Sequence, residues 1–417
     1  MKIQHLKLQN FRGIKDLELP IHEQLTLLVG INGAGKTAIL EALAIMLSWV
    51  VSRVRHAGTS GRNIQELDIN NLANFALLRV VTRQAFSWQL VKTKKGRVKP
   101  PEVSKLQQIS DYAKSLQEQI SRSSETCSIP VLVFYPTNRA VLKIPLRIRN
   151  SQSFTLLETY DDALTSAANF RHFFEWCRNR EDLENEELKY KNSPQPDKQL
   201  EAVRGALDQF LPDFKNLAVR RQPLRMTVTK QGSEIQIEQL SDGEKCLMAM
   251  IGDLARRLAI ANPTLANPLT GEGIVLIDEL DLHLHPAWQR PNMAKFTTVF
   301  PNCQFIVSTH SPQTLGEVRG DCIRLLHPDE NHNIQCHIPR QALGLDSVEI
   351  LEELMYAPIR NLETDADLKA IFKWIDAGKF TVAKSAIAAL TTKLEGSIPE
   401  IVRAESLMTM LDMEETN

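Results

Sequence analysis

The chain has 417 residues, of which 43% are apolar and 24% charged, so it is long enough for two or three ordinary domains with substantial cores. Lysine and arginine total 49, against 50 aspartates and glutamates. This balance excludes a global electrostatic attraction to nucleic acid or to an acidic membrane, so any such contact needs a local patch or a partner.

Three strands are expected before residue 30. Residues 2–9 alternate apolar and polar side chains, and a second strand is expected at 17–21 after a turn at 10–13. Residues 25–29 are almost continuously apolar, which is typical of a buried strand.

Residues 30–37 fit the phosphate-loop pattern G-x-x-x-x-G-K-[ST], and a buried apolar helix is expected directly afterwards at 38–51. The glycines let several backbone N–H groups converge on a phosphate at the start of that helix. Lys36 would reach the β- and γ-phosphates of a nucleotide, and Thr37 would hold Mg²⁺ through its hydroxyl. The predicted nucleotide-binding residues here are Asn32, Gly33, Ala34, Gly35, Lys36 and Thr37.

Strands, a loop and a helix are expected after the first helix. Residues 58–71 are rich in turn-forming side chains, strands are expected at 76–82 and 86–91, and a helix at 103–121. The basic run 92–99 is either a hairpin tip in solvent or a contact to a nucleic-acid backbone. We favour the tip because the run lacks aromatic side chains.

A further buried strand is expected at 130–135, followed by the polar residues 136–139. Ligands collect beyond the carboxyl ends of strands in α/β sheets, so these polar residues are a candidate wall of the site. From about 158 to 211 the pattern is charged and helical, which indicates a helical hairpin inserted into the α/β body. We expect its aromatic side chains to form a packing face rather than a base-stacking platform.

Residues 273–277 form an apolar strand that ends in Asp278 and Glu279. In P-loop enzymes an aspartate at such a strand end helps to hold Mg²⁺, so Asp278 joins Thr37 as a predicted metal-site residue. Glu279 is then placed to orient or deprotonate the water that attacks the γ-phosphate, and it is a predicted catalytic residue.

A helix is expected to begin at Ser241, with Glu244 completing a capping box. The capping box does not explain Gly243, which weakens a helix start unless a ligand must approach its backbone. That approach requires a second phosphate group or the nucleotide of another subunit, so Ser241 and Gly243 are predicted nucleotide contacts.

His310 follows a strand expected at 304–307 and is the second predicted catalytic residue. A neutral imidazole there can hydrogen-bond both a phosphate and the attacking water. The alternative is a core histidine with satisfied hydrogen bonds.

Together these segments resemble the ATP-binding-cassette ATPases, and within them the SMC-like and RecF-like heads. The resemblance implies an α/β fold, namely an ABC-type P-loop ATPase head with a helical insertion and a C-terminal helical region. It implies ATP and Mg²⁺ as cofactors. The expected divisions are an ATPase head at 1–157 and 216–340, a helical insertion at 158–215 and a partner-binding helical region at 341–417.

The same resemblance assigns further roles to single residues. Ser241 and Gly243 would contact the ATP of a second protomer, so at least a homodimer is expected. Asp281 would face the dimer, His310 would act as the γ-phosphate switch, and Arg12 would lie at the nucleotide because its turn is typical of these heads. The family's glutamine after strand 130–135 is missing, and Asn138 is the candidate substitute.

Asp281, His283 and His285 offer an alternative interpretation as metal ligands, since His-x-His places both rings on one side of an extended segment. A third and a fourth ligand are not evident nearby in the sequence, and the run also resembles the corresponding stretch of the cassette ATPases. We therefore favour the nucleotide-site interpretation.

A narrower resemblance, carried by residues 130–139, the helical insertion and the tail at 343–355, is to the PtuA-type ATPases of Septu and retron anti-phage systems. It implies an HNH nuclease of the PtuB type as partner, with a reverse transcriptase and retron DNA or RNA as further possible partners. Residues 347–417 are helical in pattern, which fits an autonomous helical pack or a face for a partner.

Two other functions stay open: a DNA-repair ATPase that binds DNA directly, and a scaffold that binds ATP without turnover. The six cysteines are scattered without a C-x-x-C pair, as expected for reduced thiols of a cytoplasmic protein. The first residues lack a signal-peptide core, and no apolar run is expected to be long enough to cross a bilayer. A cytoplasmic protein without a membrane partner is therefore expected.

Overall fold

The computed structural model describes residues 1–123, 126–137, 155–165, 170–190, 196–282, 284 and 286–414. The chain divides into two compact units, Met1–Ile350 and Leu351–Asn417. The first unit holds all the strands of the described residues, whereas the second is helical where it is described.

A six-stranded sheet runs through the first unit. Its strands are β3 (Leu25–Gly30), β6 (Val131–Tyr135), β10 (Gly273–Ile277), β11 (Cys303–Ser308), β12 (Ile323–Pro328) and β13 (Ile334–His337), in the order β13-β12-β3-β11-β10-β6. The strands from β12 to β6 are parallel, and β13 pairs antiparallel with β12. The carboxyl ends of β3, β11, β10 and β6 therefore meet at one edge, where the predicted site residues follow them.

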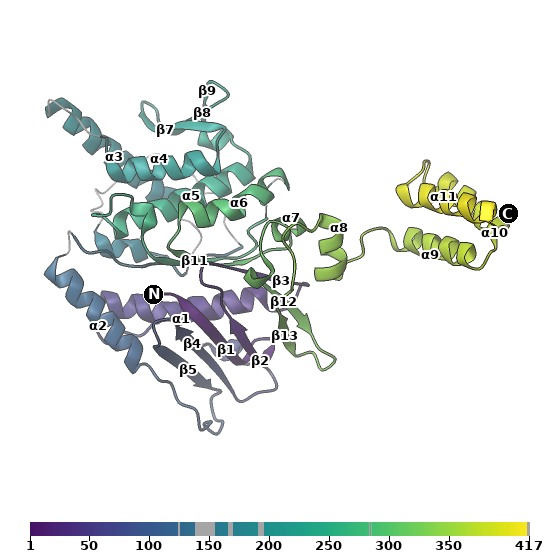
Figure 1. Cartoon of the computed structure of the whole chain (residues 1–417). Coiled ribbons are helices and arrows are strands. Elements are labelled where there is room, and N and C mark those ends of the chain that lie inside the picture. The colour runs from purple at the N-terminus through teal and green to yellow at the C-terminus, as the bar shows by residue number, and fades with distance from the viewer. Residues whose placement is uncertain are drawn as a thin grey trace. The chain divides into compact units, whose positions relative to one another are not determined.

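A second, antiparallel sheet of four strands has the order β2-β1-β4-β5, formed by β1 (Ile3–Phe11), β2 (Ile14–Pro20), β4 (Phe75–Thr82) and β5 (Ser87–Thr93). Helix α1 (Lys36–Arg55) lies between the two sheets (Figure 1), and α2 (Gln107–Arg122) packs against α1 and β5. The strands and helices expected in this part of the chain are confirmed, with ends that differ by a few residues.

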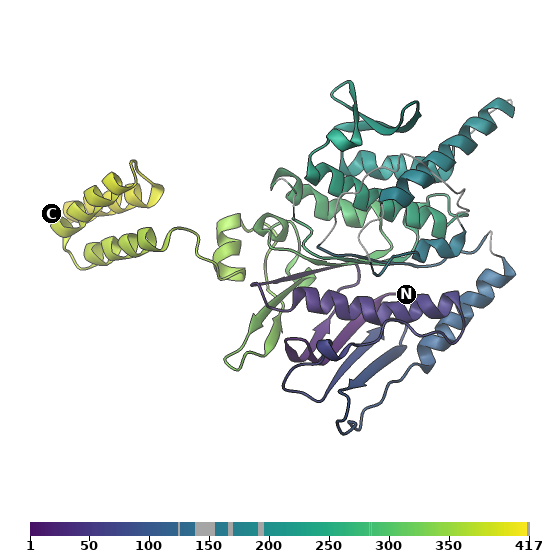
Figure 2. The same cartoon turned by 180° about the vertical axis from the view of Figure 1, so that it is seen from behind.

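Helix α1 corrects the expectation that no apolar run is long enough to cross a bilayer. By length and composition alone it is apolar enough to do so, but 72% of its most apolar window is buried inside the unit. The reason is its position between the sheets, seen from both sides in Figures 1 and 2, which covers its faces with protein. Its apolar composition is that of a core helix.

Helices cover the other face of the six-stranded sheet (Figure 2). Helix α5 (Asp242–Ala261) contacts β6, and α6 (Pro286–Val299) lies beside it. Helix α4 (Lys198–Phe210) packs on α5 and α6, α3 (Phe170–Tyr190) packs on α4 and α5, and the short α7 (Pro312–Leu315) follows later in the chain. Helices are thus confirmed in the segment 158–211. Phe173, Phe174 and Trp176 of α3 have no exposed surface, so the expectation of an aromatic packing face is also confirmed.

Five strands were not expected from the sequence. Besides β12 and β13, a small antiparallel sheet forms from β7 (Phe214–Arg221), β8 (Leu224–Lys230) and β9 (Ser233–Gln236). The register of β7 shifts between Lys215 and Ala218. Such a bulge interrupts the alternation of buried and exposed side chains, which removes the period of two that identifies a strand.

The second unit contains α9 (Leu362–Asp376), α10 (Phe380–Lys393) and α11 (Pro399–Glu414), and α8 (Ser347–Glu349) precedes it in the chain. The three longer helices enclose a core of their own, formed by Leu368, Ile371, Ile375, Ala383, Ile387, Leu390, Ile401, Ala404 and Met408. The helical pattern expected from residue 347 is confirmed over the described residues. All six cysteines are free, as expected.

Candidate nucleotide site

Side chains from the carboxyl ends of several strands of the six-stranded sheet meet at Asp278. It follows β10, its side chain is 1% exposed, and its two carboxylate oxygens accept three hydroxyl hydrogen bonds. Thr37 Oγ1 and Thr137 Oγ1 donate to Oδ2 at 2.9 and 2.8 Å, and Ser308 Oγ donates to Oδ1 at 2.5 Å. The structure thus brings together the two predicted metal-site residues, Thr37 and Asp278, although 241 positions separate them in the chain.

Two glycines of the loop at 30–37 have left-handed backbone, with φ of 87° at Gly33 and 85° at Gly35. Side-chain-bearing residues rarely adopt this conformation. A Cβ on Gly35 would lie 3.1 Å from Ile14 Cδ1, whereas one on Gly33 would meet nothing within 4 Å. Gly35 therefore packs against β2, while Gly33 and the exposed Asn32 beside it leave room for a phosphate; Ala34 is buried.

Lys36 is buried at the start of α1 and turns back onto its own loop. Its Nζ donates to the carbonyl oxygens of Gly30 and Ile31 at 2.8 and 3.1 Å. Burial lowers the pKa of the Lys36 amine, and the carboxylates of Glu279, Asp278 and Asp281 act in the opposite direction. The amine is therefore within electrostatic range of the acidic residues that follow β10.

Glu279 and His310 lie at the ends of neighbouring strands and are held by their backbones. Glu279 has a φ of 46°, and its N–H donates to Ser308 Oγ at 2.7 Å. Asp281 Oδ1 accepts from Thr309 Oγ1 at 2.7 Å and from the N–H of His310 at 3.1 Å. A non-glycine residue in this backbone region is strained by about 1–3 kcal/mol, and such strain is typical of functional sites.

The residues at this edge fit a magnesium nucleotide. Hydroxyl and carboxylate oxygens, supplied here by Thr37, Thr137 and Asp278, are ligands that Mg²⁺ prefers. Lys36 and the backbone N–H groups of the glycine loop at the start of α1 are the donors that a polyphosphate needs.

Ser241 and Gly243 lie at the start of α5 in a complete capping box. Ser241 Oγ accepts from the N–H of Glu244 at 3.4 Å, and Glu244 Oε2 accepts from the N–H of Ser241 at 2.8 Å. Lys230 of β8 donates to the other Glu244 oxygen at 2.6 Å. Burial raises the pKa of Glu244, but its hydrogen bonds to Lys230 and Ser241 outweigh this effect and lower it. Within the described part of the chain, no hydrogen bond or ion pair joins Ser241 or Gly243 to the residues around Asp278.

Arg12 is held by residues outside the phosphate loop. Its Nε donates to Asp68 Oδ1 at 2.9 Å, and its carbonyl accepts from Asn70 at 2.8 Å. Asn138 lies outside the described residues, as do His283 and His285, so the suggested metal site around Asp281 falls largely outside them too.

The sequence placed Thr137 only within the polar stretch 136–139, proposed as a wall of the site, and it assigned no role to Ser308. Both are hydroxyl residues at strand ends, where a single sequence shows nothing that separates them from ordinary surface residues. The available signal was position: Thr137 precedes the suggested Asn138, and Ser308 ends the strand before His310.

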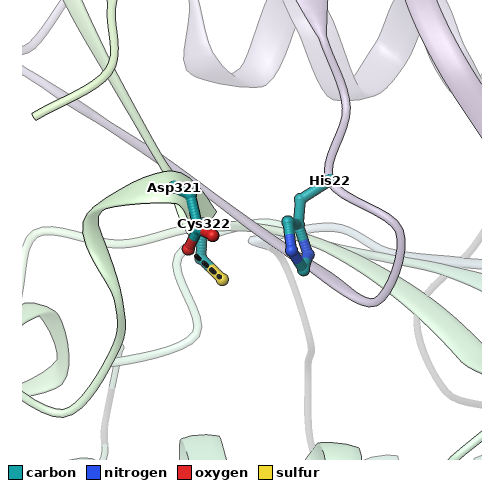
Figure 3. Close-up of side chains that lie close together, drawn as sticks. All are labelled: His22, Asp321 and Cys322. Atoms are coloured by element: carbon teal, nitrogen blue, oxygen red, sulfur yellow. Dashed lines mark hydrogen bonds between the residues drawn. The ribbon is translucent and has the colours of Figure 1, made fainter.

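A separate group of potential metal ligands lies just before the strands β3 and β12, and Figure 3 shows its three side chains. His22 precedes β3, Asp321 and Cys322 precede β12, and their ligand atoms lie within 4.8 Å of one another. However, Nδ1 of His22 accepts hydrogen bonds from two backbone N–H groups at 3.2 and 3.3 Å, so the proton of the neutral ring stays on Nε2. The positive charge of Arg324 also interacts electrostatically with Asp321 and Cys322, where a cation would have to bind. The group is better explained as a polar turn than as a cation site.

Comparisons with known proteins agree with this geometry. The family described as "AAA domain" matches residues 5–215, and "AAA domain, putative AbiEii toxin, Type IV TA system" matches residues 133–316. The Retron Vc95 probable ATPase of Vibrio cholerae is 31% identical, over 78% of this chain and 74% of that protein. The Retron Ec83 probable ATPase of Escherichia coli is 29% identical, over 85% and 76%.

Two more distant likenesses were found. The Septu protein PtuA of Bacillus thuringiensis is 24% identical over 85% of this chain and 84% of that protein. A solved SMC head bound to the C-winged helix domain of ScpA covers 81% of this chain and 98% of its own, with 14% identity and a TM-score of 0.45.

The parallel sheet, the phosphate loop and the carboxylate at the end of β10 define an ABC-type P-loop ATPase head with a C-terminal helical region. Within that class, the chain belongs to the AAA-domain family that includes the retron ATPases and the PtuA proteins of Septu. The resemblance to PtuA-type ATPases seen in the sequence is thereby confirmed.

Proposed function

We propose that this chain binds ATP with Mg²⁺ at the loop of residues 30–37 and hydrolyses it. The observation that carries the proposal is the buried Asp278 carboxylate, which accepts hydrogen bonds from Thr37, Thr137 and Ser308 beside that loop. An oxygen-rich point next to a phosphate loop suits a Mg²⁺ ion, and the residues that would hold it are Thr37 and Asp278. When bound, the ion neutralises the charge that develops on the phosphate oxygens.

The protein's own residues divide the remaining work. Lys36 places a positive charge at the phosphates, and the loop residues 32–35 surround them with backbone donors. Glu279 orients the attacking water or accepts its proton, and the His310 ring hydrogen-bonds the γ-phosphate or the same water. Asp281 supports this role because it fixes the backbone of His310 at 3.1 Å.

We also propose that two or more copies assemble through their nucleotide sites. Ser241 is exposed and caps the 20-residue helix α5, whereas Gly243, two residues further on, is buried. A helix N-terminus of this kind favours the phosphates of a second copy. Arg12 and Asn138 are proposed as the outer nucleotide contacts.

The biological role that we propose is control of a partner nuclease of the HNH type in bacterial anti-phage defence, in the cytoplasm. It is supported by the names of the relatives, which are retron ATPases and Septu proteins. The proposed divisions are the ATPase head at 1–157 and 216–340, the insertion at 158–215 and the partner-binding region at 341–417. The separate core of α9–α11 supports the last of these.

Hydrolysis is tested with Lys36→Ala and Glu279→Gln in the full chain. We expect Lys36→Ala to lose ATP binding, and Glu279→Gln to bind ATP while its turnover falls by about 100-fold or more, since that is the usual contribution of a general base. Glu118→Gln, on the exposed face of α2, is the matched control and should keep wild-type turnover. Equal turnover in Glu279→Gln and wild type would favour a scaffold that does not depend on hydrolysis.

The defence role is tested by purifying the tagged chain from its native host and challenging the cells with phage. We expect a nuclease to co-purify, and phage protection to disappear in Lys36→Ala cells. Purification without a nuclease, together with unchanged protection in Lys36→Ala cells, would contradict the proposal. Salt-sensitive, ATP-dependent DNA binding by the isolated chain would favour a DNA-repair ATPase instead.

A further inference from the structure

We propose that Thr137 is a direct ligand of the metal ion that accompanies the nucleotide, next to Thr37. This inference rests on the proposed function, and it gives a specific role to one residue of the polar stretch 136–139. The observation behind it is that the Thr137 and Thr37 hydroxyls donate to the same oxygen, Asp278 Oδ2, at 2.8 and 2.9 Å.

The two hydroxyls reach this oxygen from separate parts of the sheet. Thr37 follows the loop after β3, and Thr137 follows β6, the strand at the edge of the sheet. In the sheet order, β11 and β10 lie between those two strands. Thr37 therefore approaches Asp278 from the β3 side of β10, and Thr137 approaches it from the β6 side. A Mg²⁺ ion held beside Asp278 would receive one hydroxyl oxygen from each threonine.

The carboxylate is held so that Oδ2 keeps facing both threonines. Ser308 Oγ binds the other oxygen, Oδ1, at 2.5 Å, which prevents the group from turning. The N–H of Asp278 also donates to the carbonyl of Tyr135 at 2.9 Å, which ties the end of β10 to the end of β6. The position of Asp278 is thus fixed relative to the residues that precede Thr137.

Tyr135 anchors the end of β6, the strand that leads to Thr137. All five residues of β6 are buried, and the Tyr135 hydroxyl donates to Asp253 Oδ2 of α5 at 3.0 Å. Thr137 itself, two residues further on, is only half-buried, and its hydroxyl donates to Asp278. A fixed, partly exposed hydroxyl beside a carboxylate is suited to an ion that keeps some of its water.

A different role for Thr137 would be to orient Asp278 without touching the ion. Four variants of the full chain separate these roles. Thr137→Val removes the hydroxyl at nearly constant shape, Thr137→Ser keeps it, and Thr137→Cys replaces it with a thiol that prefers soft ions over Mg²⁺. Thr82→Val is the matched control, because Thr82 is a fully buried threonine of β4 whose hydroxyl donates to Phe86 at 2.9 Å.

The measurement is the affinity for a fluorescent ATP analogue, first in EDTA and then as a function of added Mg²⁺. We expect Thr137→Val to bind the analogue in EDTA within about twofold of wild type, and to need about tenfold or more Mg²⁺ for half of the metal-dependent gain. Thr137→Ser and Thr82→Val should respond to Mg²⁺ as wild type does. Thr137→Cys should respond poorly to Mg²⁺ and regain tight binding with Cd²⁺, whereas Thr137→Val with Cd²⁺ should not.

Two results would overturn the assignment. An unchanged Mg²⁺ response in Thr137→Val would show that the hydroxyl does not serve the ion. A weak Mg²⁺ response in both Thr137→Val and Thr137→Cys, without Cd²⁺ rescue, would show that Thr137 acts only through Asp278. If wild type itself binds no analogue, and Lys36→Ala behaves identically, then the proposed nucleotide site has failed rather than this assignment alone.

Discussion

Asp253 has no exposed surface, and three hydrogen-bond donors meet at it in the middle of α5. Arg256 and Arg257 donate to its two oxygens at 2.7 Å, and Tyr135 adds its hydroxyl at 3.0 Å. Arg257 in turn donates to the carbonyl of Thr159 at 2.6 Å. Burial raises the pKa of Asp253, but the two guanidinium groups outweigh it and lower the pKa to about 2.

This carboxylate predicts a specific acid sensitivity. Since its folded pKa of about 2 lies below the ordinary 3.8, its contribution to stability is complete above about pH 4 and is lost as the pH falls toward 2. The difference corresponds to roughly 2 kcal/mol. Asp253→Asn should lower the free energy of unfolding by about 3–5 kcal/mol at pH 7, because it leaves two buried guanidinium groups without a counter-charge.

Urea unfolding at pH 7, 4 and 3 checks this prediction. The difference in the free energy of unfolding between wild type and Asp253→Asn should narrow as the pH falls below 4. The reason is that only the wild type has a carboxylate at position 253 that can be protonated. A difference that stays constant over this range would contradict it.

At the level of residues, the sequence was sufficient for the part of the site that a local motif encodes. Lys36 and Thr37 occupy fixed places in a phosphate loop, and Asp278 ends an apolar strand, so their chemistry follows from neighbours in the chain. Thr137 and Ser308 have no such neighbours. Their role exists only because parallel strands bring their ends together, which is a property of the sheet order.

Helices α3 and α5 approach so closely that only glycine fits between them. A Cβ on Gly252 of α5 would lie 2.7 Å from Cζ of Phe173, a ring with no exposed surface of its own. A buried ring cannot move aside cheaply in a packed core. The contact therefore fixes the packing of α3 against α5, the helix that Ser241 caps.

We expect Gly252→Ala to lower stability or leave it unchanged, and Gly205→Ala to raise it. Overpacking at Gly252 costs about 1–3 kcal/mol, which exceeds or cancels the gain of about 1 kcal/mol in helix propensity. At Gly205 of α4 a Cβ meets nothing within 4 Å, so alanine there should stabilise the chain by about 0.5–1 kcal/mol. Chemical unfolding of both variants measures the two signs; a stabilised Gly252→Ala would disprove the close contact.

At the level of elements, strong periodicity and continuous apolar runs predicted well. Four of the five parallel strands of the six-stranded sheet, β3, β6, β10 and β11, are apolar throughout or nearly so, and they lie where expected. The small sheet β7–β9 was missed because its alternation is broken by a register shift and its last strand buries little. Pairing with distant segments, rather than local pattern, makes these residues strands.

The two units of the chain have separate cores, so a change in one core should leave the other intact. Ile387 is 4% exposed in the core of α9–α11. Ile387→Ala should destabilise Leu351–Asn417 by about 2–5 kcal/mol, through the lost burial and the cavity it leaves.

Hydrogen exchange on the full chain tests this separation. Exchange should accelerate in α9, α10 and α11 of Ile387→Ala and stay unchanged in Met1–Ile350. Val382→Ala, on the same helix but 46% exposed, is the matched control and should change little. Accelerated exchange around the phosphate loop in Ile387→Ala would mean that the two cores unfold together.

The sheet order has a consequence for the timing of synthesis. In the order β3-β11-β10-β6, the strand β11 separates the phosphate-loop strand from the strand that ends at Asp278, and β11 is the last of the four to be translated. Thr37 therefore cannot meet Asp278 in the native arrangement until Ser308 has left the ribosome. A nascent chain therefore carries a complete phosphate loop for most of its translation before that loop can form a site with Asp278. A nucleotide becomes a stabilising ligand only after β11 has inserted into the sheet.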